Sequence, residues 1–302
     1  MSQPDHPQHP GHSEHSEHSE HSGHPGQPET AVHQAIRAGE LVVGTFVFEF
    51  ATAGVGRLAA GAGASFVIYD TEHTGWTWET IGRLVATTRG TGADSYVRVP
   101  TTNRSEISRA LDVGARGVMV PMVESAEQAS TIVAWAKYPP AGLRGAAFGL
   151  AHDDYVRGDG AAYMRRSNAD NLVLTQIETA AGLAAVEEIA AVEGVDVLWV
   201  GQYDLTTSMG IPGEFDHPDY LAALDRVATA ARTHGKVAGF MAGTPAEAAT
   251  LAERGFSMFA YSGDLWIYQD ALRAGISDVR GKAQAGLAAG ARNGQKPTEA
   301  AK

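Results

Sequence analysis

Apolar runs of strand length alternate with helix-like segments along most of the chain. The runs are 41–50, 65–70, 95–100, 117–123, 172–178, 195–204, 236–243 and 258–264. Ser, Thr or Glu begins several of the segments between them and Gly ends them, as helix capping requires. Nearly continuous apolar strands joined by helices predict a parallel sheet covered on both faces. Eight such units predict a single (β/α)8 barrel, a fold of the α/β class.

Two further features bear on this prediction. A doubly wound open sheet is the alternative, but no Gly-rich dinucleotide-binding motif follows the first apolar run. The segment 139–170 breaks the rhythm, because it is rich in Gly, Arg and Asp and contains no clear strand. We interpret it as a long insertion between the fourth strand and its helix, and long loops in compact domains are often functional.

The first 30 residues have a different composition. They have no Lys or Arg, and their five acidic residues account for −5 of the net charge of −12. Histidine recurs there every third residue, at His6, His9, His12, His15, His18, His21 and His24. So few apolar residues cannot offset the entropy of ordering the segment, and we predict that it is disordered. Regularly spaced imidazoles also suit Zn, Ni or Cu, but a solvated extension is the interpretation we prefer.

We therefore divide the chain into a disordered His-rich tail (1–30), a barrel domain (31–288) and a flexible C-terminal tail (289–302). The absence of Cys excludes disulfides and thiolate metal sites. The N-terminus lacks the pattern of a signal peptide, and no apolar run reaches the roughly 18 residues of a membrane span. We expect a cytoplasmic protein with no membrane partner. The net charge of −12 argues against a nucleic-acid partner.

Ionisable and amide side chains gather at the ends of the predicted strands. They are Asp70, Glu72, His73, Arg98, Gln176, Glu178 and Asp204. In a (β/α)8 barrel, the carboxyl ends of the strands form the face that carries the active site. The pattern therefore predicts a catalytic site at this face.

Glu178 and Asp204 end apolar runs on neighbouring strands. Two carboxylates in a partly buried site repel each other unless something neutralises them. A hard cation such as Mg²⁺ or Mn²⁺ does so with oxygen ligands, and it keeps waters that a chelating substrate replaces. The alternative is structural, with Glu178 capping the next helix and Asp204 forming an ordinary turn.

Arg98 lies inside an otherwise apolar strand, where a guanidinium is costly without an anionic partner. It either stabilises negative charge on a substrate oxygen or forms a structural ion pair. His73 is a candidate general base, since imidazole titrates near neutrality. A base needs an orienting acceptor, and Asp112, at the end of the helix-like segment "EISRALD", is a candidate.

Several stretches together resemble the HpcH/HpaI aldolase family, metal-dependent pyruvate aldolases built on a (β/α)8 barrel. They include "YDTEHTG", "VRVPTTNRSEISRALDVGARGVMVPMVESAEQA", "KYPPAGLRG", "QIETAAGLAAVEEI", "GQYDL" and "GKVAGFMAGTPAEA". The motifs occur in family order and cover about residues 40–280, which is almost all of the predicted globular part. The resemblance does not extend to the His-rich tail.

The resemblance implies a role for each matching position. Glu178 and Asp204 correspond to the metal ligands, the ion being Mg²⁺, Mn²⁺ or Co²⁺, and Gln176 to a glutamine beside it. Arg98 corresponds to the arginine that faces the pyruvyl oxygen. His73 corresponds to a base acting through metal-bound water, and Asp112 to the aspartate that pairs with that histidine. The resemblance also implies a homo-hexamer, a trimer of dimers that exchange their C-terminal helices, here residues 264–288.

Two departures from the family pattern flank the expected site. The family often has Gly-Pro-x-Asp-Leu where this chain has Gly201, Gln202 and Tyr203 before Asp204. Trp76 follows the "EH" pair in "DTEHTGW", where many members have a proline. We expect Gly201, Gln202, Tyr203 and Trp76 to contact the substrate together with Gln176.

The expected reaction is the reversible aldol cleavage of a 4-hydroxy-2-oxo acid to pyruvate and an aldehyde through a metal-bound enolate. The partners are then a small 2-oxo acid and an aldehyde. An oxaloacetate decarboxylase or a biosynthetic enzyme that forms carbon–carbon bonds at the same site is one alternative. A metal-binding protein without catalysis, in which the His-rich tail is the functional part, is another. A lyase acting on a coenzyme A thioester is a third, which the acidic chain disfavours.

Overall fold

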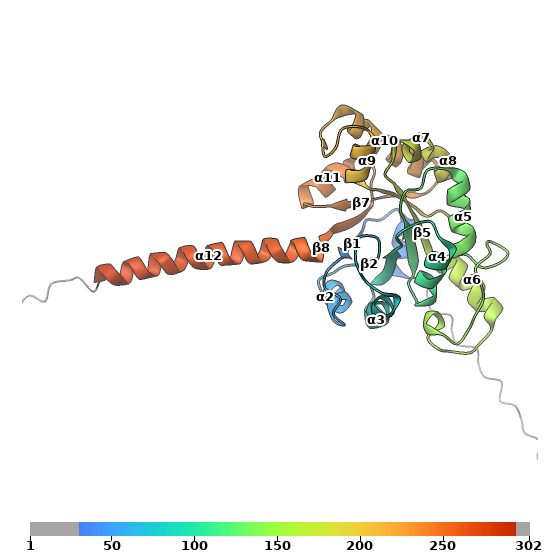
Figure 1. The fold of residues 1–302 in the computed structure, drawn as a ribbon, viewed down its shortest axis with the longest axis horizontal. Helices are drawn as coiled ribbons and strands as arrows, with labels where there is room; N and C mark the ends of the chain where they lie inside the picture. The colour runs from blue at the N-terminus through green and yellow to red at the C-terminus, as the bar shows by residue number, and fades with distance from the viewer. Residues whose placement is uncertain (1–29, 294–302) are drawn as a thin grey trace, which may run out of the picture.

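The computed structural model describes residues 30–293, which form a closed barrel of parallel strands surrounded by helices (Figure 1). The strands are β1 (Val42–Val47), β2 (Phe66–Asp70), β3 (Asp94–Arg98), β4 (Gly117–Val120), β5 (Leu172–Ile177), β6 (Val197–Val200), β7 (Val237–Ala242) and β8 (Met258–Gly263). They follow one another around the barrel in chain order, and β8 pairs with β1. Each overlaps one apolar run, and the predicted (β/α)8 barrel is confirmed.

The helices lie between the strands and cover the outside of the barrel. They are α1 (Ala31–Ala38), α2 (Val55–Gly61), α3 (Trp78–Thr88), α4 (Arg104–Asp112), α5 (Ala126–Ala136), α6 (Gly160–Asp170), α7 (Ala180–Ala184), α8 (Val186–Ala191), α9 (Gln202–Ser208), α10 (Pro218–Thr233), α11 (Pro245–Arg254) and α12 (Asp264–Asn293). Side chains cap several of their first turns, among them Thr77, Asn103, Ser125, Thr179 and Thr244. These caps satisfy N–H groups that a helix leaves unpaired.

Two apolar layers hold the barrel together. Inside it, Phe66, Tyr96 and Trp199 belong to a cluster of almost completely buried side chains. Outside it, strand residues such as Val97 pack against helix residues such as Ile81. The interior is thus a packed core rather than a channel, and chemistry is confined to the two ends of the barrel.

Helix α1 covers the amino-terminal end of the barrel. Val32 is buried in the inner cluster beside the first residues of β1 and β8, Val42 and Met258. Just before α1, the Thr30 hydroxyl donates a hydrogen bond of 2.7 Å to the carboxylate of Asp94, the first residue of β3. With this end closed by α1, the carboxyl ends of the strands are the face available for a site.

The segment 139–170 differs from our expectation in its position and content. It follows α5 instead of preceding it, and it contains the 3-10 turn η1 (Ala151–Asp153) and the whole of α6. The helix was hidden because Gly, Arg and Asn interrupt its apolar periodicity, while Asp159 caps its first turn. The long loop is therefore confined to residues 137–159.

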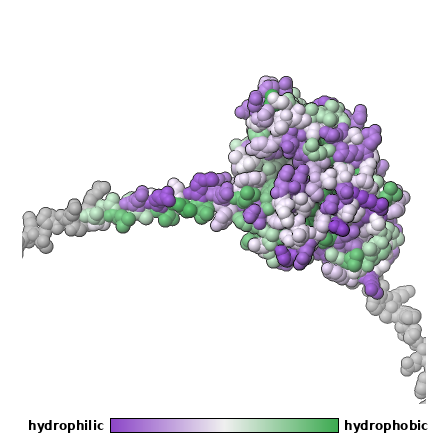
Figure 2. Space-filling view, viewed as in Figure 1, coloured by the Kyte–Doolittle hydropathy of each residue, from purple (hydrophilic) through white to green (hydrophobic). Residues whose placement is uncertain are grey.

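Helix α12 projects away from the barrel as an arm (Figure 1). One side of the arm is apolar (Figure 2), and its exposed large side chains are Trp266, Ile267, Tyr268, Leu272, Ile276, Val279 and Leu287. The helix runs to Asn293, past the domain boundary that we placed at residue 288. Of the predicted His-rich tail (1–30), residues 1–29 lie outside the described residues, as do residues 294–302, whereas Thr30 caps α1. None of the helices in the described part has the length and hydropathy needed to cross a bilayer.

Candidate functional site

The ends of β2 and β3 place an ion pair at the carboxyl face of the barrel. Asp70 and Arg98 are neighbours in the register of the two strands, and both are buried. The Arg98 Nε donates to Asp70 Oδ1 at 2.5 Å, and its Nη1 lies 3.2 Å from Glu72 Oε2. The cost of burying the guanidinium is thus offset by two carboxylates. The ion pair that we considered for Arg98 is thus formed, at the same face as the other candidate residues, and the role of Arg98 toward a substrate oxygen stays a prediction.

Asp70 also shapes the turn that carries Glu72 and His73. Its side chain accepts hydrogen bonds from the backbone N–H groups of His73, at 2.8 Å, and Glu72, at 3.3 Å. Thr74 adds a hydroxyl donor to the Asp70 carbonyl. The sequence placed Asp70 at the predicted catalytic face but gave it no role of its own. An aspartate at a strand end whose side chain bonds the backbone two and three residues on is a known turn pattern, and that signal was available.

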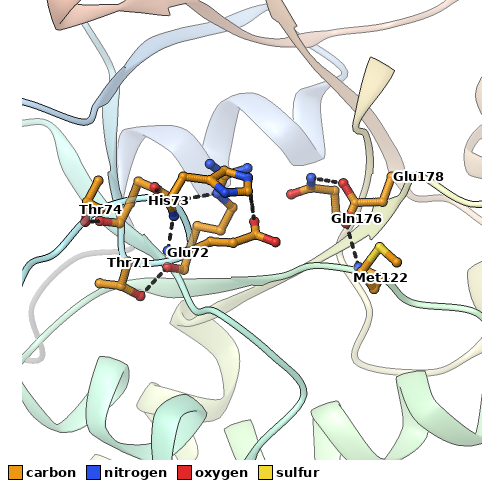
Figure 3. Close-up of polar contacts among 9 residues, drawn as sticks. Thr71, Glu72, His73, Thr74, Met122, Gln176 and Glu178 are labelled. Atoms are coloured by element: carbon orange, nitrogen blue, oxygen red, sulfur yellow. Dashed lines mark hydrogen bonds and ion pairs between the residues drawn. The ribbon is translucent and has the colours of Figure 1, made fainter. Parts of the chain in front are cut away.

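The His73 side chain is 61% exposed, and its Nε2 lies 3.8 Å from Glu72 Oε2. Figure 3 shows this turn facing Gln176 and Glu178 on the other side of the barrel mouth. Within the chain, the carboxylate that lies beside the His73 imidazole is thus that of Glu72. An exposed imidazole beside a partly buried carboxylate is placed to pass protons to solvent.

Asp112 does not meet His73 within the chain. It ends α4, and its carboxylate lies 2.7 Å from Nη2 of the buried Arg144. Helices of a barrel run antiparallel to their strands, so the last residue of α4 lies toward the opposite end of the barrel from Arg98. Asp112 instead lines a surface hollow of about 580 Å³ beside Trp135. The predicted pairing of Asp112 with His73 is therefore not formed in the single chain.

Glu178 follows β5 directly and is 1% exposed. Its Oε1 accepts a hydrogen bond of 2.7 Å from the Met122 N–H, and its Oε2 accepts one from the Gln176 amide. Thr179, not Glu178, caps α7, so the helix-capping alternative for Glu178 is wrong. Burial, together with the charges of Glu72 and Asp204, raises the pKa of Glu178 to about 7.

The pKa of Glu72 is raised by the same two causes, burial and the negative charge of neighbouring carboxylates. Burial raises its pKa to about 7, and the charges of Asp70 and Asp204 add to that effect, whereas Arg98 opposes it. The charge of Asp204 thus disfavours the ionisation of both Glu72 and Glu178. The site holds more negative charge than the guanidinium of Arg98 balances.

Asp204 lies in the first turn of α9, which begins directly after β6. Gly201 precedes that helix, and a Cβ on it would overlap the Glu178 carboxylate and the Gln176 amide. Only glycine lets the backbone approach so closely. The glycine in "GQYD" therefore serves the position of Glu178.

The remaining predicted substrate residues lie around this centre. The Gln202 amide donates to the Met241 carbonyl at 3.4 Å. Tyr203 is exposed, and its ring packs edge-on against Phe215 at 5.0 Å. Trp76 is half-buried and packs against the layer between strands and helices. The substrate contacts of all three stay a prediction.

Sequence reasoning missed Met122. It has a φ of 54°, in the left-handed region that non-glycine residues rarely adopt, and this backbone presents its N–H to Glu178. Strained backbone at a site is commonly part of the function. No signal in the sequence distinguished this methionine from a core residue.

The donor set fits a hard divalent cation. The described residues hold no group of three or more His, Asp or Glu side chains placed so that together they could hold a metal ion. They do offer two mutually repelling carboxylates, Glu178 and Asp204, and the buried Gln176 Oε1, which has no hydrogen-bond partner. Two carboxylates with neutral oxygen donors suit Mg²⁺ or Mn²⁺.

Comparison with known proteins adds a second line of evidence. Residues 46–271 match the profile of the family described as HpcH/HpaI aldolase/citrate lyase. The 5-keto-4-deoxy-D-glucarate aldolase of Klebsiella pneumoniae is 36% identical over 210 residues, which are 70% of this chain and 81% of that protein.

Two solved structures have the same fold. The HpcH/HpaI aldolase of Desulfitobacterium hafniense superposes with a TM-score of 0.79 at 32% identity, over 84% of this chain and 97% of that one. The citrate synthase SbnG gives a TM-score of 0.75 at 26% identity, over 84% and 98%. The matched region includes every candidate residue discussed above.

Proposed function

Since the chain belongs to the HpcH/HpaI aldolase/citrate lyase family and is an aldolase, a carbon–carbon lyase, we propose that it cleaves a 4-hydroxy-2-oxo acid to pyruvate and an aldehyde. The reaction is reversible, so the enzyme also joins the two products. One observation carries the proposal: the buried carboxylate of Glu178 and the exposed carboxylate of Asp204 lie near Glu72 at the carboxyl face of the barrel, and Arg98 forms an ion pair with Glu72.

A divalent cation held by Glu178 and Asp204 is part of the proposal. Bound there, it would act as a Lewis acid that polarises the keto group of the substrate. Gly201 and the Met122 N–H keep the Glu178 carboxylate in place. Its raised pKa means that the ion must compete with a proton near neutral pH.

The residues around the proposed ion site have two roles, the transfer of protons and the stabilisation of negative charge. In cleavage, a base removes the proton of the C4 hydroxyl, the C3–C4 bond breaks, and its electrons form the enolate of pyruvate. His73 is the proposed base, because its imidazole is exposed to solvent, to which it can pass the proton, and lies 3.8 Å from Glu72. Arg98 faces the developing negative charge on the enolate oxygen. Protonation at C3 then gives pyruvate.

The relatives suggest a first substrate. 5-Keto-4-deoxy-D-glucarate, the compound in the name of the Klebsiella relative, is a 4-hydroxy-2-oxo acid when numbered from its keto-acid end. Its cleavage by the route above yields pyruvate. We propose a polar hydroxy acid of this class as the substrate, with Trp76, Gln176, Gly201, Gln202 and Tyr203 around it.

The test separates enolate formation from the identity of the aldehyde. Purified protein is mixed with pyruvate in D2O, and the loss of the methyl proton signal is followed by NMR. We expect exchange with Mg²⁺, Mn²⁺ or Co²⁺, loss after EDTA, and recovery when the ion is restored. Exchange that survives complete chelation would refute the metal part of the proposal, and no exchange under any condition would refute the enolate.

One similarity favours a second candidate function, that of an oxaloacetate decarboxylase or a biosynthetic enzyme that forms carbon–carbon bonds at the same site. The citrate synthase SbnG shares this fold at 26% identity, and an enolate formed at the site of this chain could attack a ketone in the same way as an aldehyde. Release of CO2 from oxaloacetate without an aldehyde, faster than cleavage of any 4-hydroxy-2-oxo acid, would favour this alternative.

We also propose that the enzyme assembles as a homo-hexamer in which α12 covers a second copy. The apolar stripe on α12 supports this, because Leu272, Ile276 and Val279 are each more than 45% exposed, and such a stripe on a monomer promotes aggregation. Light scattering of the purified protein measures the assembly directly.

A further inference from the structure

The guanidinium of Arg98 lies against two aromatic rings as well as two carboxylates. Its central carbon is 5.3 Å from the ring centre of Phe46 and 5.7 Å from that of Phe48. The two rings are stacked at 5.1 Å with an angle of 13° between their planes. A cation over such faces is attracted by the ring quadrupole, and more strongly where water is excluded. Arg98 is 8% exposed, so it meets that condition.

Phe48 differs from Phe46 in what holds it. Phe46 is buried in the inner core against Trp199. Phe48 lies beyond β1 and is only partly buried, and the Trp266 ring of α12 packs edge-on against it at 5.2 Å. A Cβ on Gly263 would collide with both the Phe48 and Trp266 rings. A glycine at the end of β8 therefore makes room for this aromatic pair.

The first residue of α12 fixes the same segment through its backbone. The Asp264 carboxylate accepts hydrogen bonds from three successive N–H groups, those of Phe48, Glu49 and Phe50, the shortest to each being 2.9, 3.1 and 2.7 Å. Three donors on one carboxylate are a strong restraint. The base of α12 thus holds both the ring and the backbone of Phe48.

We propose that Phe48, held by Asp264 and Trp266 at the base of α12, is a positioning residue that keeps the Arg98 guanidinium at the site. Asp70 and Glu72 hold Nε and Nη1 of Arg98 by their charges, and the rings of Phe46 and Phe48 add a contact to the body of the guanidinium. Because α12 is the arm that projects from the barrel, its position is coupled to the cation that faces the substrate. The inference rests on the proposed role of Arg98 in turnover.

Phe50 supplies a matched control. Its ring packs edge-on against Tyr268 of α12 at 5.5 Å, and its N–H also bonds to Asp264, but Phe50 has no ring contact with Arg98 among those of the described residues. Phe48→Leu removes the ring beside the Arg98 guanidinium. Phe50→Leu removes a ring that belongs to the same loop and also packs against α12, but that lacks this contact with Arg98. Phe48→Tyr keeps an aromatic face.

The experiment measures these three variants and the wild-type enzyme. The readouts are kcat and KM for pyruvate proton exchange, and the ¹⁵N-resolved Nε–H resonance of Arg98, assigned with Arg98→Lys. We expect Phe48→Leu to lower kcat about tenfold with little change in KM and to move the Arg98 resonance, because a ring current is lost. Phe50→Leu and Phe48→Tyr should stay within about twofold of the wild type.

Equal loss of kcat in Phe48→Leu and Phe50→Leu would show that the ring only packs the loop and would overturn the proposal. An unchanged Arg98 resonance in Phe48→Leu would do the same, whatever the activity. If the wild-type enzyme exchanges no pyruvate protons, the proposed function fails. The resonance of Arg98 in Phe48→Leu would still decide whether this ring positions the guanidinium.

Discussion

Gly201 gives the sharpest test of the site, because its role depends on a single missing atom. In Gly201→Ala, the new Cβ would overlap Oε2 and Cβ of Glu178 and the amide nitrogen of Gln176. The backbone itself tolerates alanine, since φ at Gly201 is −95°. The perturbation is therefore steric and falls on the proposed metal ligand.

The magnitude follows from what must move. Overpacking a tight site costs about 1–3 kcal/mol. If Glu178 rotates away to relieve the overlap, that energy is lost from the bound ion and the transition state, which corresponds to about a 5- to 150-fold fall in kcat/KM. Rotation of Glu178 also breaks its hydrogen bond with the Met122 N–H.

The assay compares kcat/KM and the Mn²⁺ dissociation constant of Gly201→Ala with those of a matched variant. Gly54→Ala is that control, because Gly54 also precedes a helix, has a φ of −94°, and has open space where its Cβ would lie. We expect Gly54→Ala to behave as the wild type. Wild-type Mn²⁺ affinity and activity in Gly201→Ala would refute the reasoning. They would mean that the added Cβ does not displace the Glu178 carboxylate, or that the position of this carboxylate does not matter for the ion and for turnover.

Three further predictions test other parts of the molecule. Arg98→Lys should lower kcat about 10- to 100-fold, because an ammonium cannot bond to Asp70 and Glu72 as a guanidinium does; equal activity would contradict this. Because the pKa of Glu178 is raised to about 7, its proton contributes stability that is fully present below about pH 4.5 and is lost as the pH rises through about 7. The melting temperature in EDTA should therefore fall less between pH 5 and 8 in Glu178→Gln than in the wild type or in the surface variant Glu188→Gln. Leu272→Asp should reduce the mass measured by light scattering, whereas Ser277→Asp on the same helix should not. An assembly whose mass is unchanged in Leu272→Asp would show that the apolar stripe of α12 is not the contact between the copies.

The sequence placed the candidate residues at strand ends, but only the structure shows which of them are in contact. Asp70 and Arg98 were each visible in the sequence, but their contact depends on the register between β2 and β3. Asp112 shows the limit of that reasoning. Its place at the end of a helix was predicted correctly, but a helix that runs back along the barrel carries its last residue away from the strand ends, toward Arg144.

The sequence by itself determined the barrel and the face at which the candidate residues gather, because strand and helix periodicities are local and a parallel barrel always gathers the carboxyl ends of its strands. Only the tertiary structure decided which side chains touch. The overlap that excludes a Cβ at Gly201, the left-handed Met122 and the rings beneath Arg98 all depend on atoms from distant segments. Close approach and burial are properties of packing, and no local pattern encodes them.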